Sequence, residues 1–136
     1  MIKEVVKGEA IFQVAESAEK ADLPVARDLA DTLKANAERC VGMAANMIGI
    51  NKRIIAVFDG AKILLMLNPV IKEKSRKTYG ASEGCLSLDG ERNTLRHQTV
   101  AVEYFDEKFK KKSRTFSGFT AQIIQHEIDH CDGKII

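Results

Sequence analysis

The amino-acid sequence predicts a protein of the α+β class, in which helices and strands occupy separate stretches of the chain. Three observations support this prediction. Apolar residues recur at helical spacing between residues 22 and 38, several strand-like segments follow between residues 53 and 116, and a second helical pattern follows Ser117. Because helical and strand-like segments do not alternate, we do not expect a sheet built from parallel βαβ units.

The length and composition of the chain indicate one globular domain spanning residues 1–136. A chain with 45% hydrophobic and 29% charged residues is not expected to be disordered. The formal net charge is only +2, so we expect no direct binding to nucleic acid and no membrane partner. No apolar run approaches the roughly 20 residues of a membrane span, and a signal-peptide pattern is missing, so we expect a cytoplasmic protein.

The first predicted helix covers residues 22–38. Asp22 is its expected N-cap, Pro24 suits the first turn, and the stripe consists of Val25, Leu29 and Leu33. Two strands are predicted next, at residues 53–58 and 62–67, around the turn signal Asp59-Gly60. We expect Asn68-Pro69 to end the second strand, with a short extended segment at residues 70–72.

Further strands are predicted up to the closing helix. Residues 82–88 have an extended pattern, and residues 99–105 alternate with the period of two that strands show. A turn at residues 106–108 reverses the chain, and residues 109–116 form the returning strand. The basic run Lys110–Lys112 is interpreted as an exposed hairpin tip.

The closing helix carries the most informative pattern, His126-Glu127-Ile128-Asp129-His130. Residues four apart share one face of a helix, so both imidazoles can bind one metal ion. Glu127, beside the first histidine, can take a proton from water at that ion. Two histidines on a solvated helix face remain the alternative. We expect Ser117 to cap the start of this helix and Gly133 to stop it.

A catalytic zinc-type site usually has three protein ligands and one open position. One metalloprotease class places its third histidine six residues after the second, where this chain has Ile136. Cys131 points about 100° away from the histidine pair and is better interpreted as a packed residue. The remaining upstream candidates are Cys40, Cys85 and His97.

Cys85 is the best of these candidates because Gly84, directly before it, allows another backbone to approach closely. A buried, inert thiol is the alternative interpretation of Cys85. The three cysteines of the chain are widely spaced, which favours free thiols or metal ligands over a disulfide framework.

Three segments together resemble the signature motifs of the peptide deformylase family. They are Cys40–Gly49, Glu83–Ser87 and Gln125–His130, which occur in the family's order and at compatible separations. The region before residue 40 is shorter than is usual in the family and matches poorly. The resemblance implies a fold of mixed, largely antiparallel sheets around a central helix that carries the HExxH motif.

The resemblance also implies an activity, the removal of the formyl group from N-formylmethionyl nascent peptides, with transient proximity to the ribosome. By position, Cys85, His126 and His130 would bind one divalent metal ion. The family commonly uses ferrous iron (Fe2+), which Zn2+ or Ni2+ can replace. Glu127 would act first as general base and then as general acid. The backbone N–H of Leu86 would donate to the oxyanion.

The chain departs from the family pattern at Met47, which occupies the position of a glutamine whose amide also donates to the oxyanion. A thioether donates no hydrogen bond, and losing one such donor typically costs about 10²–10³ in turnover. Asn46 has an amide but is one residue out of phase. Cys40 replaces the first glycine of its motif. We therefore expect an intact metal site with reduced deformylation.

Two other interpretations remain open: a deformylase-like protein that binds metal or formyl-peptide without efficient turnover, and a metalloprotease built on the same helix motif. Leu86 and Ile123 are candidates for an apolar methionine pocket, although a core role is favoured for Ile123. Either Arg92 or Arg96 is expected to orient Glu83 or its loop, unless both are simply solvated.

Overall fold

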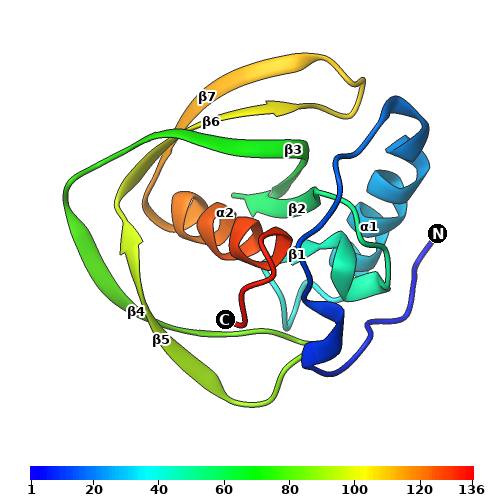
Figure 1. Ribbon diagram of the computed structural model, residues 1–136, viewed down its shortest axis with the longest axis horizontal. Coiled ribbons are helices and arrows are strands. Elements are labelled where there is room, and N and C mark those ends of the chain that lie inside the picture. Colours follow the sequence, from blue (N-terminus) through cyan, green and yellow to red (C-terminus); the bar gives the residue numbers. More distant parts are fainter.

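The computed structural model describes residues 1–136 and contains two antiparallel sheets and two α-helices, which confirms the α+β class (Figure 1). The larger sheet has the order β1 (Gly42–Ala44), β2 (Ile54–Asp59), β3 (Lys62–Lys74), β6 (Thr99–Phe105) and β7 (Lys111–Ser117). The smaller sheet pairs β4 (Thr78–Gly84) with β5 (Glu91–His97). The helices are α1 (Leu23–Ala35), α2 (Gly118–Cys131) and the short 3-10 turns η1 (Glu9–Ile11), η2 (Lys20–Asp22) and η3 (Ala45–Ile48).

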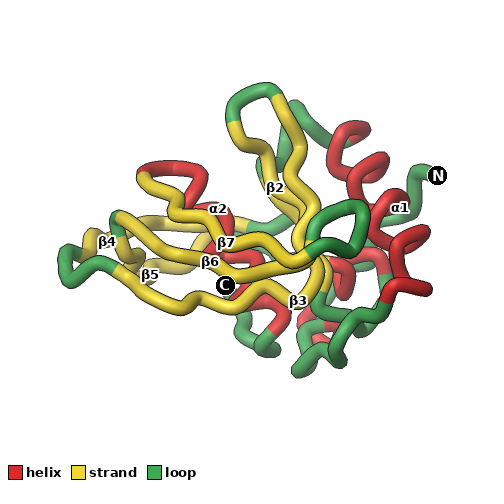
Figure 2. The backbone as a smooth tube through the Cα atoms, turned by 90° about the horizontal axis from the view of Figure 1, so that it is seen from above, coloured by secondary structure: helices red, strands yellow, loops and turns green.

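Helix α2 lies near the middle of the molecule, between the larger sheet and the β4–β5 hairpin (Figure 1). Viewed from above, α1 lies at the end opposite to that hairpin (Figure 2). Two apolar clusters fill the interior. One joins α2 to the larger sheet, and the other joins α1 to η3, β1 and β2. None of the helices has both the length and the apolar character needed to span a membrane.

The first helix is shorter than predicted and begins differently. Asp22 makes no side-chain cap for α1, because its carboxylate accepts the Glu19 N–H at 2.7 Å in a capping box around η2. The helix ends at Ala35 rather than at residue 38. Asn36 leaves the helical region, and its side-chain amide donates to the Thr32 carbonyl at 2.8 Å.

The hairpin at Asp59-Gly60 is confirmed, with Gly60 at φ 64. The strand break predicted at Asn68-Pro69 is wrong, because β3 continues to Lys74 through a change of register between Leu67 and Val70. Asn68 adopts φ 53, and its side-chain amide exchanges hydrogen bonds of 2.7 and 2.9 Å with the backbone of Ala18. A proline is accepted at such a bulge because no ladder N–H is needed there.

The alternation in β6 is confirmed, since Val100, Val102 and Tyr104 are all buried against α2. The returning strand begins at Lys111, two residues later than predicted. The Asp106 carboxylate accepts two backbone N–H groups of the preceding turn, which keeps that turn out of the ladder. The basic run Lys110–Lys112 is exposed, as predicted.

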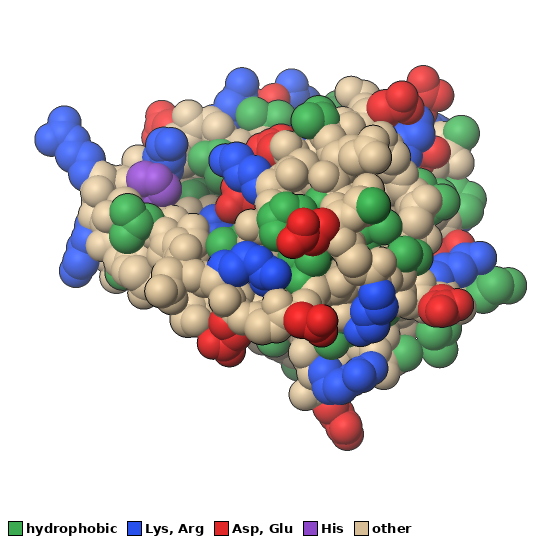
Figure 3. Space-filling view, turned by 60° about the horizontal axis from the view of Figure 1, so that its bottom comes forward, with side chains coloured by type: hydrophobic (Ala, Val, Ile, Leu, Met, Phe, Trp, Pro, Cys, Tyr) green, Lys and Arg blue, Asp and Glu red, His purple; other side chains and the backbone are tan.

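The extended segment predicted at residues 82–88 is right only as far as Gly84, where β4 ends. A turn follows, closed by a 3.1 Å hydrogen bond from the Leu88 N–H to the Cys85 carbonyl. Cys85 therefore lies directly after the strand, at the start of this turn. The surface carries both signs of charge, and Figure 3 shows Lys and Arg side chains interspersed with Asp and Glu side chains over one face.

Candidate active site

Helix α2 presents His126, Glu127 and His130 to the interior, and all three side chains are buried. Ser117 occupies the N-cap position as predicted, but its hydroxyl pairs with the Thr99 hydroxyl at 3.0 Å and caps no helical N–H. Gly133 ends the helical turn at φ 79 and donates its N–H to the His130 carbonyl at 3.0 Å, as expected of a C-terminal stop.

Cys85, directly after β4, faces the two histidines of α2. The ligand atoms of Cys85, His126 and His130 all lie within 4.8 Å of one another. The structure therefore brings together the three residues for which the sequence predicts metal binding. A thiolate and two imidazoles are a donor set suited to zinc, iron or nickel.

The other candidate ligands lie outside this group. The Cys40 thiol donates to the Gly42 carbonyl at 2.8 Å, and burial, followed by the charge of Glu127, raises the pKa of Cys40 to about 12. Cys131 is packed in the apolar cluster around α2, as predicted. His97 turns its Nδ1 toward the Ser75 carbonyl at 2.7 Å.

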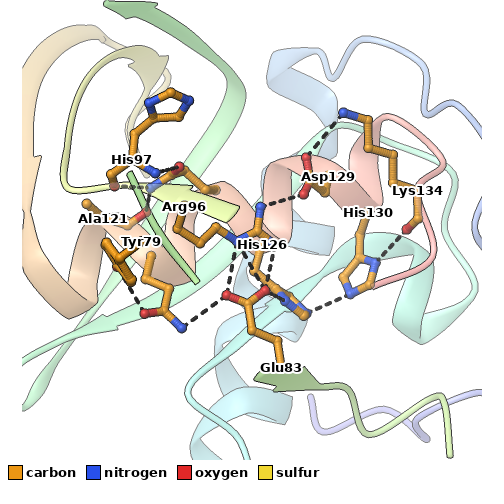
Figure 4. Close-up of polar contacts among 11 residues, drawn as sticks. Tyr79, Glu83, Arg96, His97, Ala121, His126, Asp129, His130 and Lys134 are labelled. Carbon is orange, nitrogen blue, oxygen red and sulfur yellow. Dashed lines mark hydrogen bonds and ion pairs between the residues drawn. The ribbon is translucent and has the colours of Figure 1, made fainter. Parts of the chain in front are cut away.

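The orientation of the two imidazoles is set by acceptors behind them (Figure 4). Nδ1 of His126 lies 2.8 Å from the Glu83 carboxylate, and Nδ1 of His130 lies 3.2 Å from the Lys134 carbonyl. Because both partners can only accept, they favour a proton on each Nδ1 and leave both Nε2 atoms facing the site, 3.0 Å apart. In that tautomer the two Nε2 lone pairs repel each other, and a cation bound by both would remove the repulsion.

The pKa values of the two histidines shift in opposite directions. Burial opposes the charged form of His126, but hydrogen bonds with Cys85 and Glu83 outweigh it and raise its pKa to about 10. Burial and the neighbouring His126 charge lower the pKa of His130 to about 3. The raised pKa favours a proton on His126, and a divalent ion bound by the same nitrogen would replace that proton. The donor set fits a metal ion.

A buried network of charged groups lies behind His126. It shows that Arg96, and not Arg92, orients Glu83. Arg96 donates to both oxygens of Glu83 at 2.5–3.1 Å and to Asp129 at 2.6 Å, whereas Arg92 donates to the Asp89 carbonyl. Burial alone would raise the pKa of Glu83, but the hydrogen bonds from His126 and Arg96 lower it to about 2. Glu83 therefore stays charged and fixes the His126 ring.

Glu127 is 3% exposed, and its Oε1 has no hydrogen-bond partner. Burial raises the pKa of Glu127 to about 7, and a bound cation nearby would favour the charged form and lower it. A buried carboxyl without a fixed partner beside the three donors is suited to exchange protons with a reacting molecule.

Gly42 in β1 allows the strand to approach this carboxyl. A Cβ at position 42 would lie 2.6 Å from Ile123 Cγ2 and 3.0 Å from Glu127 Oε2. We expect Gly42→Ala to push α2 or Glu127 out of place and to lower hydrolytic turnover at least ten-fold, since small misplacements of catalytic groups can cost about 10²-fold. Gly80→Ala is the matched control, because a Cβ at position 80 would meet nothing within 4 Å. Equal turnover in both variants would contradict the expectation.

Met47, on η3, is 1% exposed, and its Sδ lies 3.9 Å from the Cys85 Sγ. The neighbouring Asn46 does not take the place of the missing glutamine, because its side-chain amide donates to the His130 carbonyl at 2.8 Å. The Leu86 N–H, in the turn after β4, donates no hydrogen bond within the protein. One of the two oxyanion donors expected from the resemblance is thus free, and the other is missing.

A cavity of about 650 Å³ opens beside these groups, a size typical of small-molecule sites. Its wall includes Cys85, His126 and Glu127, and its apolar part includes Leu86 and Ile123. Ile123 also belongs to the core cluster around α2, which confirms its core role, while its role in a methionine pocket stays a prediction. Asp129, Gln122 and Gly42 were not identified from the sequence. The close approach of Gly42 depends on a contact between distant segments.

A thiol and two imidazoles within 4.8 Å of one another, beside a cavity lined by Cys85, His126 and the buried Glu127, are typical of a metal-dependent hydrolase. The family model for polypeptide deformylase matches residues 3–136. The chain is 54% identical to a peptide deformylase of Clostridium beijerinckii over 138 aligned positions, covering 100% of both chains.

Solved structures of similar fold include the class I type b peptide deformylase from Acinetobacter baumannii. Its K1U-bound form has a TM-score of 0.87 and 33% identity, covering 99% of this chain and 97% of that chain. Its Met-Ala-Ser-bound form has a TM-score of 0.87 and 27% identity, covering 99% and 96%. The chain belongs to the peptide deformylase family, a family of metal-dependent hydrolases.

Proposed function

We propose that this chain, as a single domain, removes the formyl group from N-formylmethionyl peptides in the cytoplasm, transiently close to the ribosome. The observation that carries the proposal is the convergence of Cys85, His126 and His130 within 4.8 Å beside the buried Glu127. The Met-Ala-Ser bound to the Acinetobacter baumannii relative is a methionine-led peptide, which supports this substrate class.

Cys85, His126 and His130 would hold one divalent ion, and we propose Fe2+, the ion common in the family, with Zn2+ or Ni2+ able to replace it. Bound there, the ion would supply a Lewis acid that activates water and polarises the formyl oxygen. Glu83 would keep His126 in the tautomer that ligation requires, since its carboxylate accepts the Nδ1 proton.

Residues of the chain would carry out proton transfer, oxyanion stabilisation and substrate binding. Glu127 takes a proton from the attacking water and later returns it to the leaving amine, for which its position on the cavity wall is suited. The Leu86 N–H donates to the oxygen that becomes negative. Leu86 and Ile123 offer an apolar wall to the methionine side chain. Met47 offers no donor, so we propose that turnover is reduced.

We expect Met47→Gln to raise deformylation of formyl-Met-Ala-Ser by about ten-fold or more, because it restores the second oxyanion donor. Steady-state assays at equal metal occupancy measure the effect. Met47→Leu, which adds no donor, is the comparison that separates hydrogen bonding from size. No advantage of glutamine over leucine would mean that the reduced turnover has another source, with Cys40 the next candidate.

The second candidate function is binding of metal or formyl-peptide without efficient turnover, and the missing donor at Met47 is the observation that favours it. A formate-release assay on the wild-type chain at full metal occupancy decides between the two candidate functions. We expect measurable release of formate that depends on the metal. Tight peptide binding with no release of formate would instead establish the binding function.

A further inference from the structure

A second sulfur lies beside the three expected ligands. Met47 Sδ is 3.9 Å from Cys85 Sγ, and Met47 lines the same cavity as Cys85, His126 and Glu127. Two sulfurs bound at about 2.3 Å to one tetrahedral ion lie about 3.8 Å apart. In this structure the Cys85 thiol donates to the Met47 thioether across this distance, and the same separation suits two sulfur ligands of one ion.

Two hydrogen bonds tie the η3 segment around Met47 to other parts of the chain. The Met47 carbonyl accepts the Val6 N–H at 2.8 Å, which ties η3 to the N-terminal segment. The Asn46 amide donates to the His130 carbonyl at 2.8 Å, which ties η3 to the helix that carries both histidines. The side chain is 1% exposed, so its sulfur faces protein and not bulk water.

We propose that Met47 Sδ is a fourth, weak ligand of the ion held by Cys85, His126 and His130, an inference that rests on the proposed function. A set of one thiolate, two imidazoles and one thioether is softer than a set with water in the fourth position, so the site favours soft ions such as Cd²⁺ or Cu⁺. A thioether is a neutral, weak donor, and it competes with water for the fourth position. The substitution at position 47 thus changes the metal preference as well as the oxyanion donors.

The test counts sulfur ligands by X-ray absorption spectroscopy on the full chain loaded with Cd²⁺. We expect two sulfur neighbours in the wild-type chain and one in Met47→Leu. We also expect the Kd for Cd²⁺ to rise about ten-fold in Met47→Leu, the lower end of what losing one supporting interaction costs a metal site. The Kd for Zn²⁺, the less soft ion, is expected to change less.

Met43→Leu is the matched control, because Met43 is fully buried in the same apolar cluster but does not line the cavity. This variant is expected to keep two sulfur neighbours. One sulfur neighbour in the wild-type chain, or two in Met47→Leu, overturns the inference. A site with one sulfur and two imidazoles leaves the proposed function standing, whereas a chain that binds no ion overturns both.

Discussion

Glu127→Gln is expected to lower deformylation by about 10²–10⁴-fold, the usual contribution of a general acid–base group. Glutamine has nearly the same shape as glutamate, but it neither accepts a proton from water nor returns one to an amine. Glu127 touches no expected ligand through a hydrogen bond, and its Oε1 has no partner in the protein. Metal content should therefore stay at the wild-type level while turnover falls.

The measurement is turnover and metal content on the same preparation of the variant. Glu91→Gln is the matched control, since Glu91 lines the same cavity but is exposed and accepts a hydrogen bond from Ser82 at 2.9 Å. We expect it to change turnover little. A Glu127→Gln variant with wild-type turnover would remove Glu127 from the proposed chemistry.

Arg96→Met should destabilise the fold by about 3–5 kcal/mol, the range typical when one partner of a buried ion pair is removed. Arg96 and Glu83 are 4% and 7% exposed, and Arg96 also pairs with Asp129. Without the guanidinium, the Glu83 carboxylate keeps only the hydrogen bonds from His126 and Gln122. The loss should appear as a lower free energy of unfolding in urea.

Arg92→Met, on the same strand, provides the control for Arg96→Met. Arg92 is only partly buried, and its hydrogen bond goes to the Asp89 carbonyl, three residues earlier in the chain. We expect Arg92→Met to lower the free energy of unfolding by much less than Arg96→Met does. Equal losses of stability at the two positions would show that the Glu83 network does not have the structural role assigned to it.

The fold class followed from the sequence because periodicity reports local burial. The alternation in β6 and the stripe of α1 each mark a buried face, and both are found. The ends of elements were less accurate. The bulge at Asn68 and the first turn of α1 depend on hydrogen bonds to Ala18 and Glu19, which lie outside those elements.

In the candidate site, too, local patterns were predicted correctly, whereas several contacts between distant segments were not. The histidine spacing in α2 indicated one shared face, whereas Cys85 was preferred over Cys40 because of the adjacent Gly84, and the family resemblance then supported that choice. The role of Arg96 could be stated only as one of two options, because burial of a particular arginine depends on the packing of β5 against α2. The closeness of the Met47 and Cys85 sulfurs joins η3 to the turn after β4, a contact that no local pattern reveals.

Metal analysis and deformylation measured on one sample test the central claim most directly, because that claim joins Cys85, His126 and His130 to one ion. We expect one divalent ion per chain, release of formate from formyl-Met-Ala-Ser in proportion to metal content, and loss of both in Cys85→Ala. A Cys85→Ala variant that kept its full metal content and its turnover would contradict the account.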